Sequence, residues 1–88
     1  MSTPRILVVD DDKAVRTALR VNLSKRGMDV TVVNGVHQAL AELQRRPFDL
    51  VLTDVQMPGA TGLELLTRVR SSWPDIQVVV MTGYGSVR

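Results

Sequence analysis

The chain has 88 residues, of which 44% are hydrophobic, and a formal charge of +2 from eleven basic and nine acidic side chains. This length allows one small domain with its own hydrophobic core. The absence of cysteine excludes disulfides and thiolate metal sites. The basic residues are scattered, which does not favour nucleic-acid binding by this segment. The apolar runs are too short to cross a membrane, and no signal-peptide segment precedes the first of them. We therefore expect a soluble, cytoplasmic protein.

Strand and helix patterns alternate along the whole chain. Four short apolar runs have the composition of strands, at Ile6–Val9, Met28–Val33, Leu50–Asp54 and Ile76–Met81. The stretches between them have the apolar spacing of helices, at about 13–26, 35–46 and 62–73. The alternating pattern of the second strand favours a position at an edge of a sheet. Short connections of this kind predict a doubly wound α/β domain over residues 1–88, with a parallel sheet and helices on both faces.

Local signals mark the ends of the predicted helices. Asp12 and Asn34 precede the first two helices as candidate N-caps. Thr61 and Glu64 have the spacing of a capping box before the third helix, and Gly27 can end the first helix at positive φ. The residues expected to face the sheet are Val15, Ala18, Leu19 and Leu23 in the first helix, Val36, Ala39, Leu40 and Leu43 in the second, and Leu65, Leu66, Val69 and Trp73 in the third.

Carboxylates stand where two of these strands end. Asp10 and Asp11 follow the first strand and Asp54 ends the third, while Thr82 follows the fourth. Ligands of open α/β sheets bind at the carboxyl ends of strands. If the first and third strands are neighbours, the carboxylates repel by roughly 4 kcal/mol per close pair at an effective dielectric near 20. A hard cation with oxygen ligands, most simply Mg²⁺, would offset that repulsion. Asp54 could then attack phosphorus as a nucleophile, with Thr82 donating a hydrogen bond to a phosphoryl oxygen.

Each of these residues also has a simpler explanation. Asp54 could start the turn at Pro58-Gly59, because Asp is common in turns. The acidic residues after the first strand could only cap a helix, and Asp12 is expected to do so. Thr82 could be an ordinary strand-end threonine. His37 has no second His or Cys nearby, which favours a solvated surface residue over a metal ligand.

Three segments together resemble the receiver domain of two-component response regulators: Ile6–Asp12, Leu50–Gly62 and Val79–Gly83. The resemblance covers essentially the whole chain. It implies the flavodoxin-like strand order, and a phosphoryl group that a histidine kinase transfers to Asp54.

The same resemblance implies a metal site and a switch residue. Asp10 and Asp11 would be its acidic pair. Asp11 would bind Mg²⁺ directly, beside Asp54 and the backbone carbonyl of Gln56. Thr82 would be the hydroxyl that moves to the phosphate. A receiver is a phosphoacceptor that at most catalyses its own phosphorylation and dephosphorylation.

The sequence of residues 81–87 is most similar to that of receivers of the nitrogen-regulator class. Those receivers activate transcription through an alternative sigma factor, using an ATPase domain and a helix-turn-helix domain downstream. A complete receiver also has a fourth helix, a fifth strand that carries a lysine and an aromatic residue, and a fifth helix. The 88 residues resemble only the amino-terminal part of such a domain. The fourth strand would then be an open apolar edge, so we expect self-association or low stability of this piece alone.

Two other classes of function use similar features. A phosphatase or phosphotransferase could also use an aspartyl nucleophile, but such enzymes usually have a second acid two residues later, where this chain has Gln56. A non-catalytic interaction module could use the same fold as a scaffold. That alternative leaves the carboxylates at both strand ends unexplained.

Overall fold

In the part of the chain that the structure describes, four strands and three helices follow one another in the predicted order. The computed structural model describes residues 3–57 and 59–81. The strands are β1 (Arg5–Val9), β2 (Asp29–Val33), β3 (Leu50–Asp54) and β4 (Gln77–Met81), and the helices are α1 (Lys13–Lys25), α2 (Val36–Arg45) and α3 (Gly62–Ser72). None of the helices in the described part of the chain combines the length and the apolar character that crossing a bilayer requires.

The strands form one parallel sheet in the order β2-β1-β3-β4. β2 lies at an edge, as its alternating sequence predicts, and β1 and β3 are neighbours. Val9 pairs with Val33 on one side and with Thr53 on the other, while Asp54 pairs with Met81. The carboxyl ends of all four strands therefore meet at one edge of the sheet. The predicted doubly wound α/β class and the implied strand order are confirmed for the described residues.

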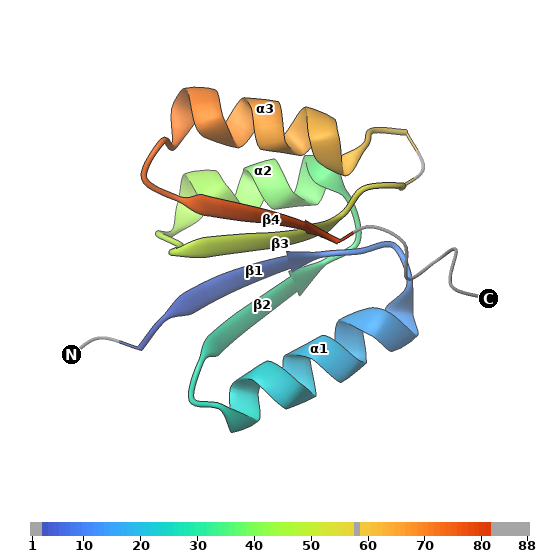
Figure 1. The fold of residues 1–88 in the computed structure, drawn as a ribbon, viewed down its shortest axis with the longest axis vertical. Helices are drawn as coiled ribbons and strands as arrows, with labels where there is room; N and C mark the ends of the chain where they lie inside the picture. The colour runs from blue at the N-terminus through green and yellow to red at the C-terminus, as the bar shows by residue number, and fades with distance from the viewer. Residues whose placement is uncertain (1–2, 58, 82–88) are drawn as a thin grey trace.

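Helices cover both faces of this sheet. α2 and α3 lie together on one face, and α1 lies on the other (Figure 1). Alternate side chains of β1 and β3 point toward α2 and α3, because side chains alternate across a strand. Full burial of such aliphatic side chains stabilises the fold by about 1.5–3 kcal/mol each. The buried core on this face comprises Leu7, Val9, Val36, Ala39, Leu43, Phe48, Val51, Met57, Leu65 and Val69.

α1 is covered less completely than its sequence predicts. None of its residues is buried: Val15, Leu19 and Leu23 are half-buried, and Ala18 is exposed. α1 packs on β1 and β2, at one side of the sheet. On the same face, Val79 of β4 is 48% exposed. The prediction that Ala18 is buried is wrong, because a single helix over an edge pair of strands leaves its flank in solvent.

The predicted helix starts are confirmed at two positions and wrong at a third. The Asp12 side chain accepts hydrogen bonds from two N–H groups in the first turn of α1. Thr61 and Glu64 form the predicted capping box at α3. At α2 the N-cap is Gly35, with no side-chain hydrogen bond, and not Asn34. The extended backbone of Gly35, with φ −175°, leads directly into the helix, so Asn34 lies one residue too early to cap it.

Candidate functional site

Three carboxylates meet at the carboxyl edge of the sheet. Asp10 and Asp11 follow β1, and Asp54 is the last residue of the neighbouring strand β3. One carboxylate oxygen from each of them lies within 4.8 Å of the other two. The predicted proximity of these side chains is therefore confirmed. At that distance two carboxylates repel by roughly 3 kcal/mol at an effective dielectric near 20, and by less where water reaches them.

Asp10 is the most deeply placed of the three, with 1% of its surface exposed. Its Oδ1 accepts a hydrogen bond from the backbone N–H of Asp12 at 2.9 Å. Its carbonyl oxygen accepts one from Nη1 of Arg16, also at 2.9 Å. Burial raises the pKa of Asp10 above its ordinary value of 3.8; the Asp12 hydrogen bond opposes this rise, and the charge of Asp54 adds to it. A cation at this position would favour the ionised form.

Asp54 faces the acidic pair from the end of β3 and remains partly accessible to solvent. Its Oδ1 accepts a long hydrogen bond, 3.3 Å, from the backbone N–H of Gln56, whose residue is exposed. The backbone N–H of Val55, which lies between Asp54 and Gln56, donates to the carbonyl oxygen of Met81 at 3.3 Å. The end of β4 is thereby held beside Asp54. Thr82, the residue after Met81, lies outside the described residues, so its role as a hydrogen-bond donor stays a prediction.

Two neighbours of the Asp54 main chain carry no signal of their role in the local sequence. Thr53 is completely buried, and its hydroxyl donates to the Asp54 carbonyl oxygen at 3.0 Å. Gly62, the first residue of α3, packs against the main chain of Asp54 and Val55, and its N–H donates to the Val55 carbonyl at 3.0 Å. A glycine where a helix begins is the one sequence feature that could have drawn attention to this contact. The partner of Gly62 is set by the tertiary fold.

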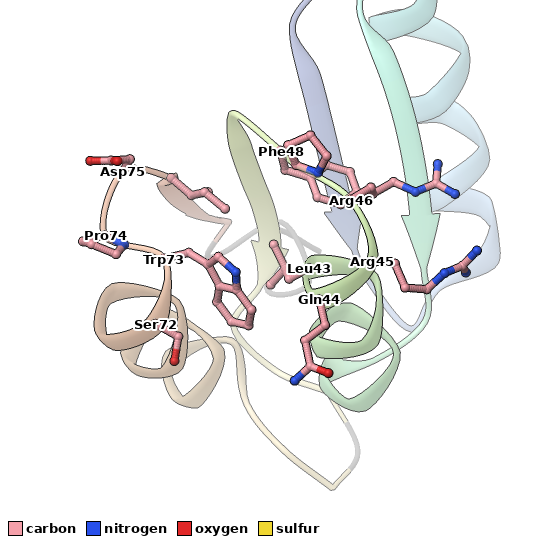
Figure 2. Close-up of a pocket in the computed structure, with 11 residues that line it drawn as sticks. Leu43, Gln44, Arg45, Arg46, Phe48, Ser72, Trp73, Pro74 and Asp75 are labelled. Carbon is pink, nitrogen blue, oxygen red and sulfur yellow. The ribbon is translucent and has the colours of Figure 1, made fainter.

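The hollow at this edge is no larger than one at the other end of the sheet. A cavity of about 500 Å³ beside the acids is lined in part by Asp11 and by His37, which is exposed as predicted. A groove of about 550 Å³ opens between the ends of α2 and α3, where Trp73 faces Leu43 (Figure 2). The lining of that groove contains a single acidic residue, Asp75. The chemistry of the side chains, and not the size of a hollow, therefore identifies the candidate site.

The three carboxylates fit a hard divalent cation. All three offer oxygen ligands, which Mg²⁺ prefers, and none offers sulfur or imidazole. Their mutual repulsion and the burial of Asp10 both create a need for positive charge. The structure brings Asp10, Asp11 and Asp54 together, and their role as metal ligands stays a prediction. The contribution of the Gln56 carbonyl stays a prediction.

Comparison with known protein families gives one match that covers nearly the whole chain. The model of the response regulator receiver domain matches residues 6–88. Among curated proteins, the response regulator protein FleR of Pseudomonas aeruginosa is 41% identical over 94% of this chain. The transcriptional regulatory protein ZraR of Escherichia coli O157:H7 is 43% identical over 93%. The chain spans 18% of the length of FleR and 19% of the length of ZraR.

Solved structures give the same result for the fold. The response regulator protein TrrA of Thermotoga maritima, in complex with Mg²⁺-BeF, superimposes with a TM-score of 0.88 at 32% identity. That alignment covers 98% of this chain and 75% of TrrA. A second structure holds TrrA in complex with the histidine kinase ThkA, with a TM-score of 0.87 at 33% identity over 93% of this chain and 71% of the matched one.

Proposed function

The chain belongs to the response regulator receiver family, and from this premise we propose that it accepts a phosphoryl group from a sensor histidine kinase onto Asp54. One observation carries the proposal: carboxylates from two adjacent strands converge at the carboxyl edge of the sheet. Asp54 is the member of this cluster that ends a strand and stays partly accessible. The pairing of the similar protein TrrA with a histidine kinase supports the class of donor.

The proposed transfer is an in-line displacement at phosphorus. A carboxylate oxygen of Asp54 forms a bond to phosphorus while the bond between phosphorus and the donor imidazole nitrogen breaks. The electron pair of the broken bond stays on the imidazole, and the product is an aspartyl phosphate. Asp11, Asp54 and the Gln56 carbonyl would hold Mg²⁺, with Asp10 beside them. The bound ion supplies positive charge to the phosphoryl oxygens. The Thr82 hydroxyl would donate a hydrogen bond to one of them.

We further propose that the phosphorylated state controls an output domain elsewhere in the full-length protein, in the cytoplasm. The sequence of residues 81–87 and the similarity to the transcriptional regulatory protein ZraR support an output in transcription. The proposed output is activation through an alternative sigma factor, by an ATPase domain and a DNA-binding domain. In this scheme the chain has no turnover of a separate substrate, because its chemistry is limited to gaining and losing its own phosphoryl group.

β4 supports a proposal of self-association. It is an edge strand of the described sheet, and Gln77–Met81 contains no charged residue. An uncharged apolar edge offers unpaired N–H and C=O groups to another chain. Sedimentation of the 88-residue chain at increasing concentration tests this. We expect a rise in apparent mass with concentration, and a constant monomer mass at high micromolar concentration would contradict it.

A single experiment separates the receiver from the two other classes. Incubation of the full-length protein with acetyl phosphate and Mg²⁺, followed by intact mass spectrometry, should give one phosphoryl adduct that hydroxylamine removes. Continuous release of phosphate from many donor molecules per chain would indicate a phosphatase or phosphotransferase. The amide at Gln56, where such enzymes usually have a second acid, argues against that outcome. The absence of any adduct would indicate an interaction module and overturn the proposal.

A further inference from the structure

The main chain that follows the candidate phosphoacceptor is fixed at three consecutive polar groups. The Asp54 carbonyl oxygen accepts the Thr53 hydroxyl at 3.0 Å. The Val55 N–H donates to the Met81 carbonyl at 3.3 Å, and the Val55 carbonyl accepts the N–H of Gly62 at 3.0 Å. β3 ends at Asp54, so these contacts hold the chain where the ladder of the sheet stops. None of these three hydrogen bonds involves the Asp54 carboxylate.

Gly62 approaches this main chain more closely than any other residue type could. A Cβ built on Gly62 would overlap the Asp54 carbonyl oxygen and would lie 2.9 Å from the Asp54 carbonyl carbon and 3.1 Å from the Val55 Cα. All three atoms belong to the backbone, so no flexible side chain can move away. The backbone of Gly62 is not at positive φ. Glycine is therefore required here by the contact with Asp54 and not by its own conformation.

Thr53 holds the same carbonyl from inside the core. Its side chain is completely buried on the face that carries α2 and α3. A buried hydroxyl needs a hydrogen-bond partner. The Thr53 hydroxyl donates to the main-chain carbonyl oxygen of the next residue, Asp54. A methyl group in place of the hydroxyl would need about 3.5 Å or more from that oxygen. It would therefore push the Asp54 carbonyl away and remove the hydrogen bond at once.

We propose that Thr53 and Gly62 are positioning residues: by fixing the main-chain carbonyl group of Asp54, they set the direction of the Asp54 carboxylate. The proposal rests on the proposed function of Asp54 as phosphoacceptor. A single methylene group joins the carboxylate to the Asp54 Cα, so a displacement of the Asp54 main chain moves the carboxylate relative to Asp10 and Asp11. A displacement of about 1 Å at a reacting group can reduce a rate by about a hundredfold.

The test compares variants of the full-length protein at saturating Mg²⁺ and acetyl phosphate, with the phosphorylation rate expressed per folded molecule. Thr53→Val and Gly62→Ala should react about 10- to 100-fold more slowly than the wild type. Thr53→Ser keeps the hydroxyl and should stay within about twofold of the wild-type rate on the same reasoning. Gly27→Ala is the matched control: its backbone has φ +87° and its Cβ would meet nothing within 4 Å. This variant should lower the melting temperature and leave the rate per folded molecule unchanged.

The outcomes distinguish a failure of the proposed phosphoacceptor function from a failure of the positioning role alone. A wild-type protein that takes up no phosphoryl group would overturn the proposed function, and this inference with it. A wild type that is phosphorylated, with Thr53→Val reacting at the same rate per folded molecule, would overturn the inference alone. In that case Thr53 would be a core threonine that only satisfies its own hydroxyl. If Gly62→Ala does not fold, the comparison of Thr53→Val with Thr53→Ser still decides.

Discussion

The two ends of the parallel sheet hold hollows of similar size and opposite character. At the carboxyl edge, Asp10, Asp11 and Asp54 place three carboxylates within 4.8 Å of one another beside a cavity of about 500 Å³. At the other edge, a groove of about 550 Å³ has Phe48 and Trp73 in its lining, with arginines at its rim. The two ends differ in their effect on the stability of the fold. Like charges are gathered at one end, and the other end shows ordinary packing with exposed ion pairs. Unfavourable electrostatics that the fold tolerates at one place are a sign of function there.

The largest expected contrast is in phosphorylation. Asp54→Asn should abolish labelling of the full-length protein by its kinase, because the amide cannot attack phosphorus. Trp73→Ala, at the opposite end, should be labelled at the wild-type rate even though loss of a half-buried indole costs about 2 kcal/mol of stability. Transfer of labelled phosphate, measured below both melting temperatures, checks the pair. Label that persists in Asp54→Asn would move the site elsewhere.

The second contrast is in metal affinity. Asp11→Ala should weaken Mg²⁺ binding by about tenfold or more, because a carboxylate ligand is lost. Without metal, the same variant should melt at a higher temperature than the wild type, because one source of repulsion is gone. Asp75→Ala removes an exposed acid at the groove end and serves as the control. Titration calorimetry with Mg²⁺ measures both affinities, and an unchanged affinity in Asp11→Ala would remove that residue from the metal site.

The third contrast is in the pH dependence of stability. Burial raises the pKa of Asp10 above 3.8, so the folded chain binds this proton more tightly than the unfolded chain does. Stability from this group therefore increases as the pH falls through the raised pKa toward 3.8, and the cost of the buried charge is fully present above the raised pKa.

Asp10→Asn removes that cost and keeps an oxygen for the Asp12 N–H. Without metal, we expect its melting temperature to exceed that of the wild type at pH 7, by a margin that shrinks as the pH falls toward 3.8. Thermal unfolding in a series of buffers gives this margin directly. A margin that stays constant with pH would show that the variant acts through packing and not through charge.

The smallest effect is expected among the ion pairs of the groove end. Glu42 lies 3.1 Å from Arg45 and 3.4 Å from Arg46; the two arginine side chains are 65% and 45% exposed, and that of Glu42 is 18% exposed. Ion pairs at this helical spacing contribute about 0.3–0.5 kcal/mol each. Glu42→Gln should therefore change the free energy of unfolding by about 1 kcal/mol or less and leave phosphorylation unaltered. Denaturant unfolding measures it, and a loss of phosphorylation here would mean that the two ends are coupled.

Features that depend on neighbours in sequence were predictable. The strands, the helices, the Asp12 cap and the Thr61–Glu64 capping box all follow from composition, apolar period and short-range hydrogen bonding. The proximity of Asp11 and Asp54 needed one further step, the order of the strands. That order came from the family resemblance, because apolar periods do not say which strands are adjacent.

Features that depend on the exact backbone geometry or on the tertiary fold were missed. Ala18 has the correct helical spacing for burial, yet it is exposed because α1 covers only one side of the sheet. Thr53 reads as one more β-branched strand residue, and its hydroxyl contact with Asp54 depends on a local backbone geometry that the pattern does not encode. In the sequence, Gly62 is only a glycine at the start of the predicted third helix. Its contact with the Asp54 main chain depends on how α3 packs against β3, which no local rule predicts.

The most direct test of the account is to locate the phosphoryl group by chemical trapping. Borohydride reduces an aspartyl phosphate to homoserine, and peptide mapping then reads the position of the new residue. After transfer from the kinase in the presence of Mg²⁺, we predict homoserine at position 54 in the full-length protein and none in the Asp54→Asn variant. Homoserine at Asp10 or Asp11, or a trapped product in Asp54→Asn, would contradict the assignment of Asp54 as the phosphoacceptor.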